Sequence, residues 1–487
     1  MAPETALLWL RRDLRLHDNP ALVAATAADR LLPVYVVDPR QYGVADFGGS
    51  DSFRFEKTGA RRTTFRIEAL ADLRARLRSR GSDLVVRTGE PEVVLPDLVD
   101  RVDADAVHVH TRPTPEERAV EAWVEDALGG GPETPRIAGE AGGPPLVRHW
   151  GHTLYHPDDL PVDVADVADT YTPFRKRVES DATVRDPHPV PALPARPAVD
   201  PGTIPTAADL GIDAEPLDDR AVLDFEGGET SGLERVEEYV WETDSLRTYK
   251  GTRNGLLGPN FSSKLSPWLN EGCLSPRRVN EAVDRYEDRR VANDSTYWLR
   301  FELRWRDFFQ FQFAKHGATA FTKGGIRRRD IDWVDDPAAF ERWKRGRTGI
   351  PFVDANMREL NATGYMSNRG RQNAASFLAN DLRIDWRKGA AYFETRLVDY
   401  EPASNYGNWA YIAGVGNDSR NRSFDVLGQA KRYDPDADYV TTWLPELDGL
   451  PPTAAHEPWR LSPEERATYG VELAVDYPRP MIDLTDA

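Results

Sequence analysis

Three serines and a proline precede an apolar stretch in the second half of the chain. Ser262 and Ser263 come first, and Ser266 is followed directly by Pro267. Proline fits the first turn of a helix, where free amides and nearby hydroxyls can bind an anion. The segment therefore predicts a phosphate-binding helix start. A plain serine cap without any ligand is the alternative.

A second cluster combines aromatic rings with a carboxylate. Trp298, Glu302, Trp305 and Arg306 fall on or near one face of an expected helix over 295–314. Aromatic rings suit stacking on a nucleic-acid base, and a carboxylate suits hydrogen bonding to its polar edge. The cluster predicts a pocket for an unstacked base. An aromatic stripe at this spacing is also typical of a hydrophobic core, which is the alternative.

A third cluster brings guanidinium groups to the start of an expected helix. Asn368, Arg369 and Arg371 open it, and Asp399 and Glu401 follow later in the chain. An ion pair between Arg371 and Asp399 is compatible with this order, because arginine and carboxylate pair in a fork geometry. The spacing alone does not establish the pair.

The elements that must position these residues differ between the two halves of the chain. Strands are expected at 6–10, 31–37, 84–86 and 106–109, with a helix over 60–80. This alternation indicates a parallel α/β sheet. No G-x-G-x-x-G and no P-loop sequence follows these strands, so the sheet is not the expected cofactor site.

A stretch rich in proline, alanine and aspartate, from about residue 186 to 219, separates the sheet from a region of helices. We expect an α/β domain at 1–150, a connector at 151–232 and an all-α domain at 233–487. Helices are expected at 233–242, 275–289, 295–314, 338–345, 351–363, 368–382 and 389–397.

The composition indicates a globular protein without metal sites. Forty per cent of residues are hydrophobic, and no apolar run approaches the roughly 20 residues that span a bilayer. The N-terminus lacks a signal-peptide pattern, so we expect a cytoplasmic protein without a membrane partner. One cysteine, Cys273, excludes an internal disulfide, and nine scattered histidines show no zinc-ligand spacing.

The charge balance is strongly acidic. The net charge is −18, and only nine of the 62 basic residues are lysine. Nucleic-acid binding depends on cationic side chains, so a chain of this charge needs locally basic surface to bind DNA. Our hypothesis is adaptation to high salt, where a dispersed acidic surface aids solubility. An ordinary acidic cytosolic protein is the alternative.

Six stretches in a fixed order carry the most specific signal. They lie at residues 8–22, 252–258, 265–269, 293–298, 364–373 and 404–409. Together they resemble the photolyase/cryptochrome family, and its DASH branch in particular. The resemblance covers nearly all of the chain. It implies an antenna-type α/β domain followed by an all-α domain that binds FAD folded in a U.

The resemblance also implies roles for individual residues around FAD. Tyr249 and the 262–266 segment lie near its phosphates, and Arg371 pairs with Asp399 beside the isoalloxazine ring. The 262–266 segment comprises Ser262, Ser263, Lys264, Leu265 and Ser266. Asn405 faces the flavin N5, and Glu401, which is Asp in many relatives, lies near the ring or the ribose.

Further residues match family positions for substrate and electron transfer. The implied lesion pocket contains Glu302, Trp305, Asn368, Gln372 and Tyr411. The implied phosphate contacts are Arg253, Arg306, Arg369 and Lys431. The implied electron-transfer chain from flavin to surface is Trp409, Trp386 and Trp333. Without the resemblance each of these tryptophans would be interpreted as core.

The implied function is blue-light-driven repair of cyclobutane pyrimidine dimers in DNA, a carbon–carbon lyase reaction. Excited, reduced FAD would donate an electron to a flipped-out dimer, and Glu302 would stabilise the charge that develops. Repair of (6-4) photoproducts would require histidine in the pocket, whereas the helical domain contains only His316 and His456. A cryptochrome photoreceptor that repairs little DNA remains the alternative from another class.

The resemblance leaves the antenna chromophore in question. DASH relatives usually bind methenyltetrahydrofolate through a glutamate just after a strand, and the matching residue here is Arg112. A guanidinium cannot accept hydrogen bonds from the pterin. We therefore expect weak or absent folate, replaced by a deazaflavin or by nothing. We further expect a monomer that prefers single-stranded DNA, where an unstacked lesion is least costly to flip.

Overall fold

The computed structural model describes residues 4–49, 51–129, 143–418 and 423–482. Five parallel strands form a sheet in the order β5-β2-β1-β6-β7. Their bounds are β1 (Thr5–Leu10), β2 (Arg30–Val37), β5 (Val85–Thr88), β6 (Ala106–His110) and β7 (Leu146–His149). The central strand β1 and its neighbour β2 are almost wholly buried, as expected of strands covered on both faces.

The expected strands and the expected fold class are confirmed, and three short strands add to them. The helices of this domain are α1 (Pro20–Ala25), α2 (Ala60–Arg78), α3 (Pro91–Val102) and α4 (Pro115–Ala127). The sequence analysis missed β7, which contains Arg148 and His149 and so lacks an apolar run. It also missed the hairpin of β3 (Val44–Phe47) and β4 (Phe53–Glu56), whose residues are exposed or only half-buried.

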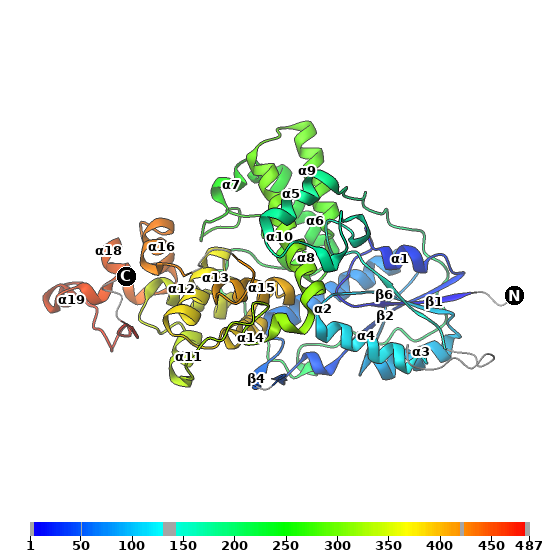
Figure 1. Cartoon of the computed structure of the whole chain (residues 1–487), viewed down its shortest axis with the longest axis horizontal. Coiled ribbons are helices and arrows are strands. Elements are labelled where there is room, and N and C mark those ends of the chain that lie inside the picture. The colour runs from blue at the N-terminus through cyan, green and yellow to red at the C-terminus, as the bar shows by residue number, and fades with distance from the viewer. Residues whose placement is uncertain (1–3, 50, 130–142, 419–422, 483–487) are drawn as a thin grey trace.

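The remainder of the chain is helical, beginning with a helix inside the expected connector. Its elements are α5 (Tyr171–Asp181), α6 (Glu229–Glu237), α7 (Tyr249–Thr252), α8 (Ser266–Asn270), α9 (Pro276–Arg289), α10 (Asp294–His316), α11 (Pro337–Lys344), α12 (Pro351–Thr363), α13 (Asn368–Ser376), α14 (Trp386–Arg396), α15 (Pro402–Ile412), α16 (Val426–Tyr433), α17 (Asp438–Trp443), α18 (Pro452–His456) and α19 (Pro463–Tyr469). Figure 1 shows the sheet at one end of an elongated molecule and α16–α19 at the other, with α10, α14 and α15 between them.

Two of the helices continue into a wider π-helical turn. One such turn, Glu238–Glu242, follows α6, and the other, Phe377–Asp381, follows α13. Both lie within single expected helices, at 233–242 and 368–382. Wider turns of this kind are frequent near functional sites. They place α6 and α13 among the elements to consider for the site.

Guanidinium groups join the sheet domain to the helical half along a boundary that we call the domain seam. They donate to main-chain carbonyl oxygens: Arg12 to Tyr400 (2.5 Å), Arg15 to Gly272 (2.9 Å) and Arg62 to Glu394 (2.5 Å). A buried ion pair between Asp18 and Arg277 (2.5 Å) lies in the same seam. Buried charges need such partners, so the two halves are held in one arrangement.

Within the described residues, no helix is long and apolar enough to cross a membrane. In the same ranges, no three His, Cys, Asp or Glu side chains converge as a metal site would require. Cys273 is buried, and burial raises the pKa of its thiol, which keeps it protonated.

Candidate functional site

Asp399 is the centre of a buried polar cluster that joins α8 and α13. Its Oδ2 accepts hydrogen bonds from Ser266 Oγ at 2.6 Å and from Arg371 Nη2 at 2.9 Å. Asn270 Nδ2 donates to the main-chain oxygen of Asp399 at 2.6 Å. The ion pair between Arg371 and Asp399 is therefore confirmed. It holds the first turn of α13 against α8.

The second carboxylate oxygen of Asp399 is free to bind a ligand. Asp399 is 4% exposed, and its Oδ1 is buried without a hydrogen-bond partner. A buried carboxylate oxygen requires a donor, and the isoalloxazine ring of FAD carries N–H donors. Asn405 Nδ2 donates to Ala390 O at 2.9 Å, which leaves its amide oxygen as an acceptor nearby in α15. These residues fit the flavin that the sequence predicted.

The predicted phosphate loop is shaped by an arginine that the sequence analysis missed. Arg235 of α6 donates to the carbonyl oxygens of Ser263 (3.1 Å) and Ser262 (3.4 Å). Lys264 has a positive φ of 52°, and its ammonium group donates back to the carbonyl oxygen of Pro259 at 2.9 Å. Burial lowers the pKa of Lys264 to about 6. These hydrogen bonds direct the side chain of Lys264 into its own loop. If Lys264 contacts the cofactor, it does so through main-chain atoms.

Glu302 lies on α10 between a cation and an indole. Its Oε1 is 3.1 Å from Arg253 Nη1 and accepts a hydrogen bond from Trp298 Nε1 at 3.2 Å. Burial raises the pKa of Glu302, although Arg253 and Trp298 both act to lower it. Tyr249 of α7 is buried close by, and burial raises the pKa of its phenol well above the usual value. A carboxyl group here is more easily protonated than an exposed one, so it can donate a hydrogen bond.

Aromatic rings continue this site along α10. The ring of Trp305 stacks on Tyr171 with centroids 3.6 Å apart and meets Tyr411 edge-on at 6.2 Å. Tyr171 OH donates to Phe301 O at 2.9 Å, which fixes its ring. The sequence analysis missed Tyr171 because it lies in the connector. Glu302, Trp305 and Tyr411 are thus brought together as predicted for a base pocket.

Polar side chains from the first turn of α13 and from α16 form a cluster. Asn368, the first residue of α13, is exposed. Arg369 Nη1 donates to Gln372 Oε1 at 3.0 Å and to Gln429 Oε1 at 3.1 Å. Its guanidinium lies over the ring of Tyr433 at 4.5 Å. Lys431, on the same helix as Gln429, pairs with Glu457 and is half-exposed. The roles of these residues toward DNA stay predictions.

Two predicted contacts receive other roles from the structure. Arg306 donates to the carbonyl oxygens of His152 and Leu269 in the domain seam, and its assignment to a DNA phosphate stays a prediction. Glu401 is 1% exposed and caps α15, because it accepts from the amides of Ala403 (3.2 Å) and Ser404 (2.7 Å). A carboxylate just before Pro402 at a helix start is a signal that the sequence already carried.

The three predicted electron-transfer tryptophans lie on α15 (Trp409), at the start of α14 (Trp386) and in the segment before α11 (Trp333), and their role stays a prediction. Trp409 and Trp386 are buried, whereas Trp333 is partly exposed. A methyl group built at Gly389 would clash with the ring of Trp409, so α14 and α15 meet closely there. Trp386 lies one turn before Gly389. The bridge between Val334 and Ile384 brings Trp333 next to the start of α14.

Three exposed arginines that the sequence analysis did not single out lie beside Tyr411. Arg327–Arg329 follow a turn at Gly325, and the amide of Arg327 donates to Val415 O at 3.2 Å. Gly416, next to Val415, lies against the ring of Tyr411. This segment supplies locally basic surface to an acidic chain.

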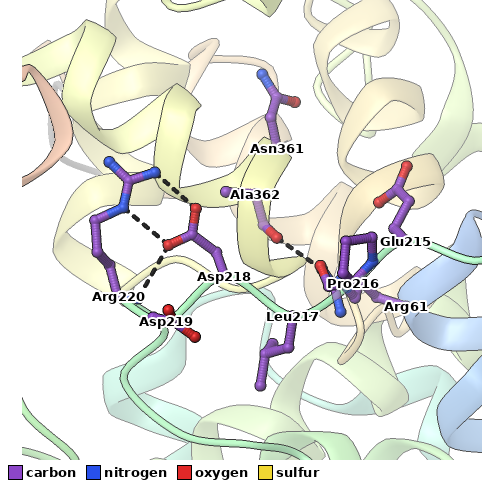
Figure 2. Close-up of a pocket in the computed structure, with 9 residues that line it drawn as sticks. All are labelled: Arg61, Glu215, Pro216, Leu217, Asp218, Asp219, Arg220, Asn361 and Ala362. Carbon is purple, nitrogen blue, oxygen red and sulfur yellow. Dashed lines mark hydrogen bonds and ion pairs between the residues drawn. The ribbon is translucent and has the colours of Figure 1, made fainter.

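A further cavity lies away from these residues. Figure 2 shows it between the connector and the end of α12, with a volume of about 630 Å³. None of its lining residues was predicted to bind FAD or DNA, and carboxylates outnumber arginines among them. The lining residues are Arg61, Glu215, Pro216, Leu217, Asp218, Asp219, Arg220, Asn361 and Ala362. An anionic cofactor does not fit this charge balance.

Comparison with known protein families matches one region in the sheet domain and one in the helical half of the chain. Residues 6–195 match the family described as DNA photolyase, and residues 298–487 match the FAD binding domain of DNA photolyase. The chain is 59% identical to cryptochrome DASH of Natronomonas pharaonis, over 99% of this chain and 98% of that protein. It is 53% identical to cryptochrome DASH of Gloeobacter violaceus, over 99% and 94%.

Solved structures agree with the fold. A Synechocystis cryptochrome superposes with a TM-score of 0.92 at 44% identity, covering 99% of this chain and 97% of that one. A bacterial class III photolyase from Agrobacterium tumefaciens superposes with a TM-score of 0.83 at 30% identity, over 99% and 95%. The chain therefore belongs to the photolyase/cryptochrome family of flavoproteins and carries its FAD-binding domain.

Proposed function

We propose that this protein repairs cyclobutane pyrimidine dimers in DNA in a light-driven, FAD-dependent reaction. The observation that carries the proposal is Glu302, a carboxyl group with a raised pKa beside the stacked ring of Trp305. A thymine offers carbonyl oxygens at its polar edge, and a protonated carboxyl group is a donor for them. The family match to DNA photolyase supports the same substrate class.

FAD, when bound and reduced, supplies the electron that light transfers to the dimer. Asp399, fixed by Arg371 and Ser266, holds a carboxylate oxygen ready for an N–H donor of that cofactor. Glu302 donates a hydrogen bond where negative charge develops on the lesion, which stabilises that charge. Trp305 and Tyr411 offer faces and edges for the flipped bases.

The proposed substrate preference is single-stranded DNA. Flipping costs least where the lesion is unstacked, and an acidic chain gains little from duplex phosphates to offset that cost. Arg253, Arg369, Lys431 and the exposed segment Arg327–Arg329 are the proposed phosphate contacts.

The test is dimer splitting under blue light with fully reduced enzyme, on single-stranded and duplex oligonucleotides at the same salt concentration. We expect repair of both, with the single strand repaired faster. Equal or faster repair of the duplex would contradict the preference. If neither substrate is repaired, the proposal fails and a photoreceptor role replaces it.

Replacing Trp409 by phenylalanine should abolish photoreduction of oxidised FAD, because Trp409 is the first member of the proposed chain. Repair by chemically reduced enzyme should persist. The measurement is the loss of flavin absorbance under blue light with an external reductant. Trp443→Phe, a buried tryptophan of α17, is the control. Photoreduction at the wild-type rate in Trp409→Phe would remove Trp409 from this role.

The purified protein should contain little or no methenyltetrahydrofolate. Arg112 is buried, and its guanidinium offers only donors where a pterin needs an acceptor. The check is the near-ultraviolet absorption spectrum together with mass spectrometry of the released cofactors. A stoichiometric folate signal would refute this expectation.

A further inference from the structure

Tyr406 lies on α15, three residues before Trp409, and is buried. Its ring meets the ring of Trp386 edge-on, with the two centroids 6.1 Å apart. Its hydroxyl donates to Oε2 of Glu394, on α14, at 3.3 Å. A phenol that contacts a tryptophan ring and also a carboxylate can lose an electron to the first and a proton to the second.

The three predicted electron-transfer tryptophans have no base at their indole nitrogens. Trp386 Nε1 donates to the main-chain oxygen of Lys323 at 3.1 Å, and an amide oxygen does not take up a proton near neutral pH. Within the described residues, the Nε1 atoms of Trp409 and Trp333 are buried without a hydrogen-bond partner. An oxidised tryptophan in this chain therefore keeps its proton and its positive charge. Such a charge is costly in a buried site, so there is a driving force for it to move on.

Glu394 is the base that these indoles lack. Its carboxylate is buried and forms an ion pair with Lys57, whose Nζ lies 3.5 Å from Oε1. The other oxygen, Oε2, accepts from Tyr400 at 2.8 Å as well as from Tyr406. Lys57 also pairs with Glu116 at 2.5 Å. When Glu394 takes up a proton, the lysine therefore keeps a counter-ion.

Tyr406 is better placed than Tyr400 to lose an electron. The guanidinium of Arg62 lies over the ring of Tyr400 at 4.7 Å, and a cation over a ring opposes its oxidation. Arg387 also contributes positive charge near Tyr406, but it is balanced by Asp385 at 2.7 Å. The rings that contact Tyr406 are neutral. They are Trp386, Phe321 and Phe47, with centroids 6.1, 4.8 and 5.9 Å from that of Tyr406.

We propose that Tyr406 and Glu394 form a side branch of the tryptophan chain, which traps the oxidising equivalent left by photoreduction of FAD. The inference rests on the proposed chain. Under light, Trp409 reduces bound FAD and is itself reduced by Trp386, which is left oxidised by one electron. An electron then passes from Tyr406 to Trp386, and the phenolic O–H bond breaks as its proton moves to Glu394 Oε2. Trp386 is neutral again, Tyr406 is a neutral radical, and Glu394 carries a new O–H bond.

The branch keeps the separated charges apart for longer than the tryptophans alone. An electron that returns to Tyr406 must be accompanied by the proton on Glu394, so direct recombination is slow. Both side chains are buried, and an external one-electron reductant reaches them slowly. That reductant finally restores the electron, and Glu394 returns the proton to the phenolate oxygen. Reduced FAD therefore has time to persist.

The first experiment needs no variant. Wild-type protein with oxidised FAD and no added reductant receives a blue flash, followed by transient absorption and electron paramagnetic resonance. A tryptophan radical should appear first and a tyrosyl radical should replace it, more slowly in D2O because a proton moves. Ring-deuterated tyrosine should change the hyperfine pattern of the second signal. Tryptophan radicals alone would overturn the proposal and leave the chain standing, whereas no protein radical at all would overturn both.

The second experiment assigns the signal by substitution, with flavin absorbance confirming that FAD stays bound. Tyr406→Phe should lose the tyrosyl radical and keep the tryptophan radical. Glu394→Gln keeps the phenol but removes its base, so the tyrosyl radical should also be lost. Tyr400→Phe, which removes the other phenol on the same carboxylate, is the matched control and should keep it. A tyrosyl signal that survives in Tyr406→Phe or Glu394→Gln, or that disappears in Tyr400→Phe, would overturn the assignment.

Discussion

Replacing Glu302 by alanine should lower the yield of dimer splitting by roughly a hundredfold while FAD stays bound. Removing a preorganised donor from developing negative charge typically has an effect of this size. Glu302 contacts Arg253 and Trp298, whereas Asp399, Arg371 and Ser266 form the flavin cluster. The yield of repaired dimer per absorbed photon measures the first effect, and flavin absorbance measures the second.

The pH dependence and a conservative variant separate this role from a structural one. Because burial raises the pKa of Glu302, the protonated donor is present below that pKa and is lost as the pH rises through it. Repair by wild type should fall over that range. Glu302→Gln keeps a donor at every pH, so it should retain more activity than Glu302→Ala and lose the pH dependence. Asp288→Ala, on the exposed face of α9, is the control. Wild-type repair by Glu302→Ala would exclude the proposed role.

Replacing Arg371 by methionine should yield protein that retains little or no FAD after purification. The change leaves the buried carboxylate of Asp399 without its cation. Breaking a buried ion pair in this way typically lowers the free energy of unfolding by about 3–5 kcal/mol. Asp399 would then bind a proton or move, and the first turn of α13 would lose its link to α8. The ratio of flavin to protein absorbance, and titration with added FAD, report the loss.

A second arginine pair in the same domain provides the matched control. Arg358 forms two hydrogen bonds with Glu446, at 2.7 and 3.0 Å, and each partner is about as accessible as Arg371. Arg358→Met should therefore keep its FAD. If Arg371→Met retains stoichiometric FAD at normal affinity, the cluster around Asp399 does not hold the cofactor.

Much of the architecture could be predicted because hydrophobic periodicity follows from burial. The helix over 351–363 has these bounds as α12, since a proline begins it and a glycine follows it. The pairing of Arg371 with Asp399 could be suspected from residue types alone. Helical spacing shows which face a residue shares but not what covers that face. The resemblance assigned Arg306 to DNA, and spacing could not show that its guanidinium contacts main-chain oxygens in the domain seam.

The residues that were missed act across long separations in sequence. Tyr171 stacks on Trp305 from a connector helix, and Arg235 fixes a loop that begins more than twenty residues later. No local pattern reports such contacts, because they arise only when distant elements pack. Glu401 differs from these, since its place just before Pro402 is a local cap signal that the sequence carries.

The seam contacts of Arg12, Arg15 and Arg62 have a consequence for how relatives of this chain can diverge. Each guanidinium donates to a main-chain oxygen, and every residue type presents such an oxygen. At Tyr400 and Glu394 the contact therefore sets no requirement on the type of the accepting residue, while the donating arginines cannot change. Gly272 is constrained for another reason, because its φ is 75° and a side chain there would clash with Arg12. An insertion that shifts the backbone near Tyr400 or Glu394 would break the contacts without altering any of the residues that make them. Sequence drift should be tolerated on the helical side of this boundary, and length changes should not.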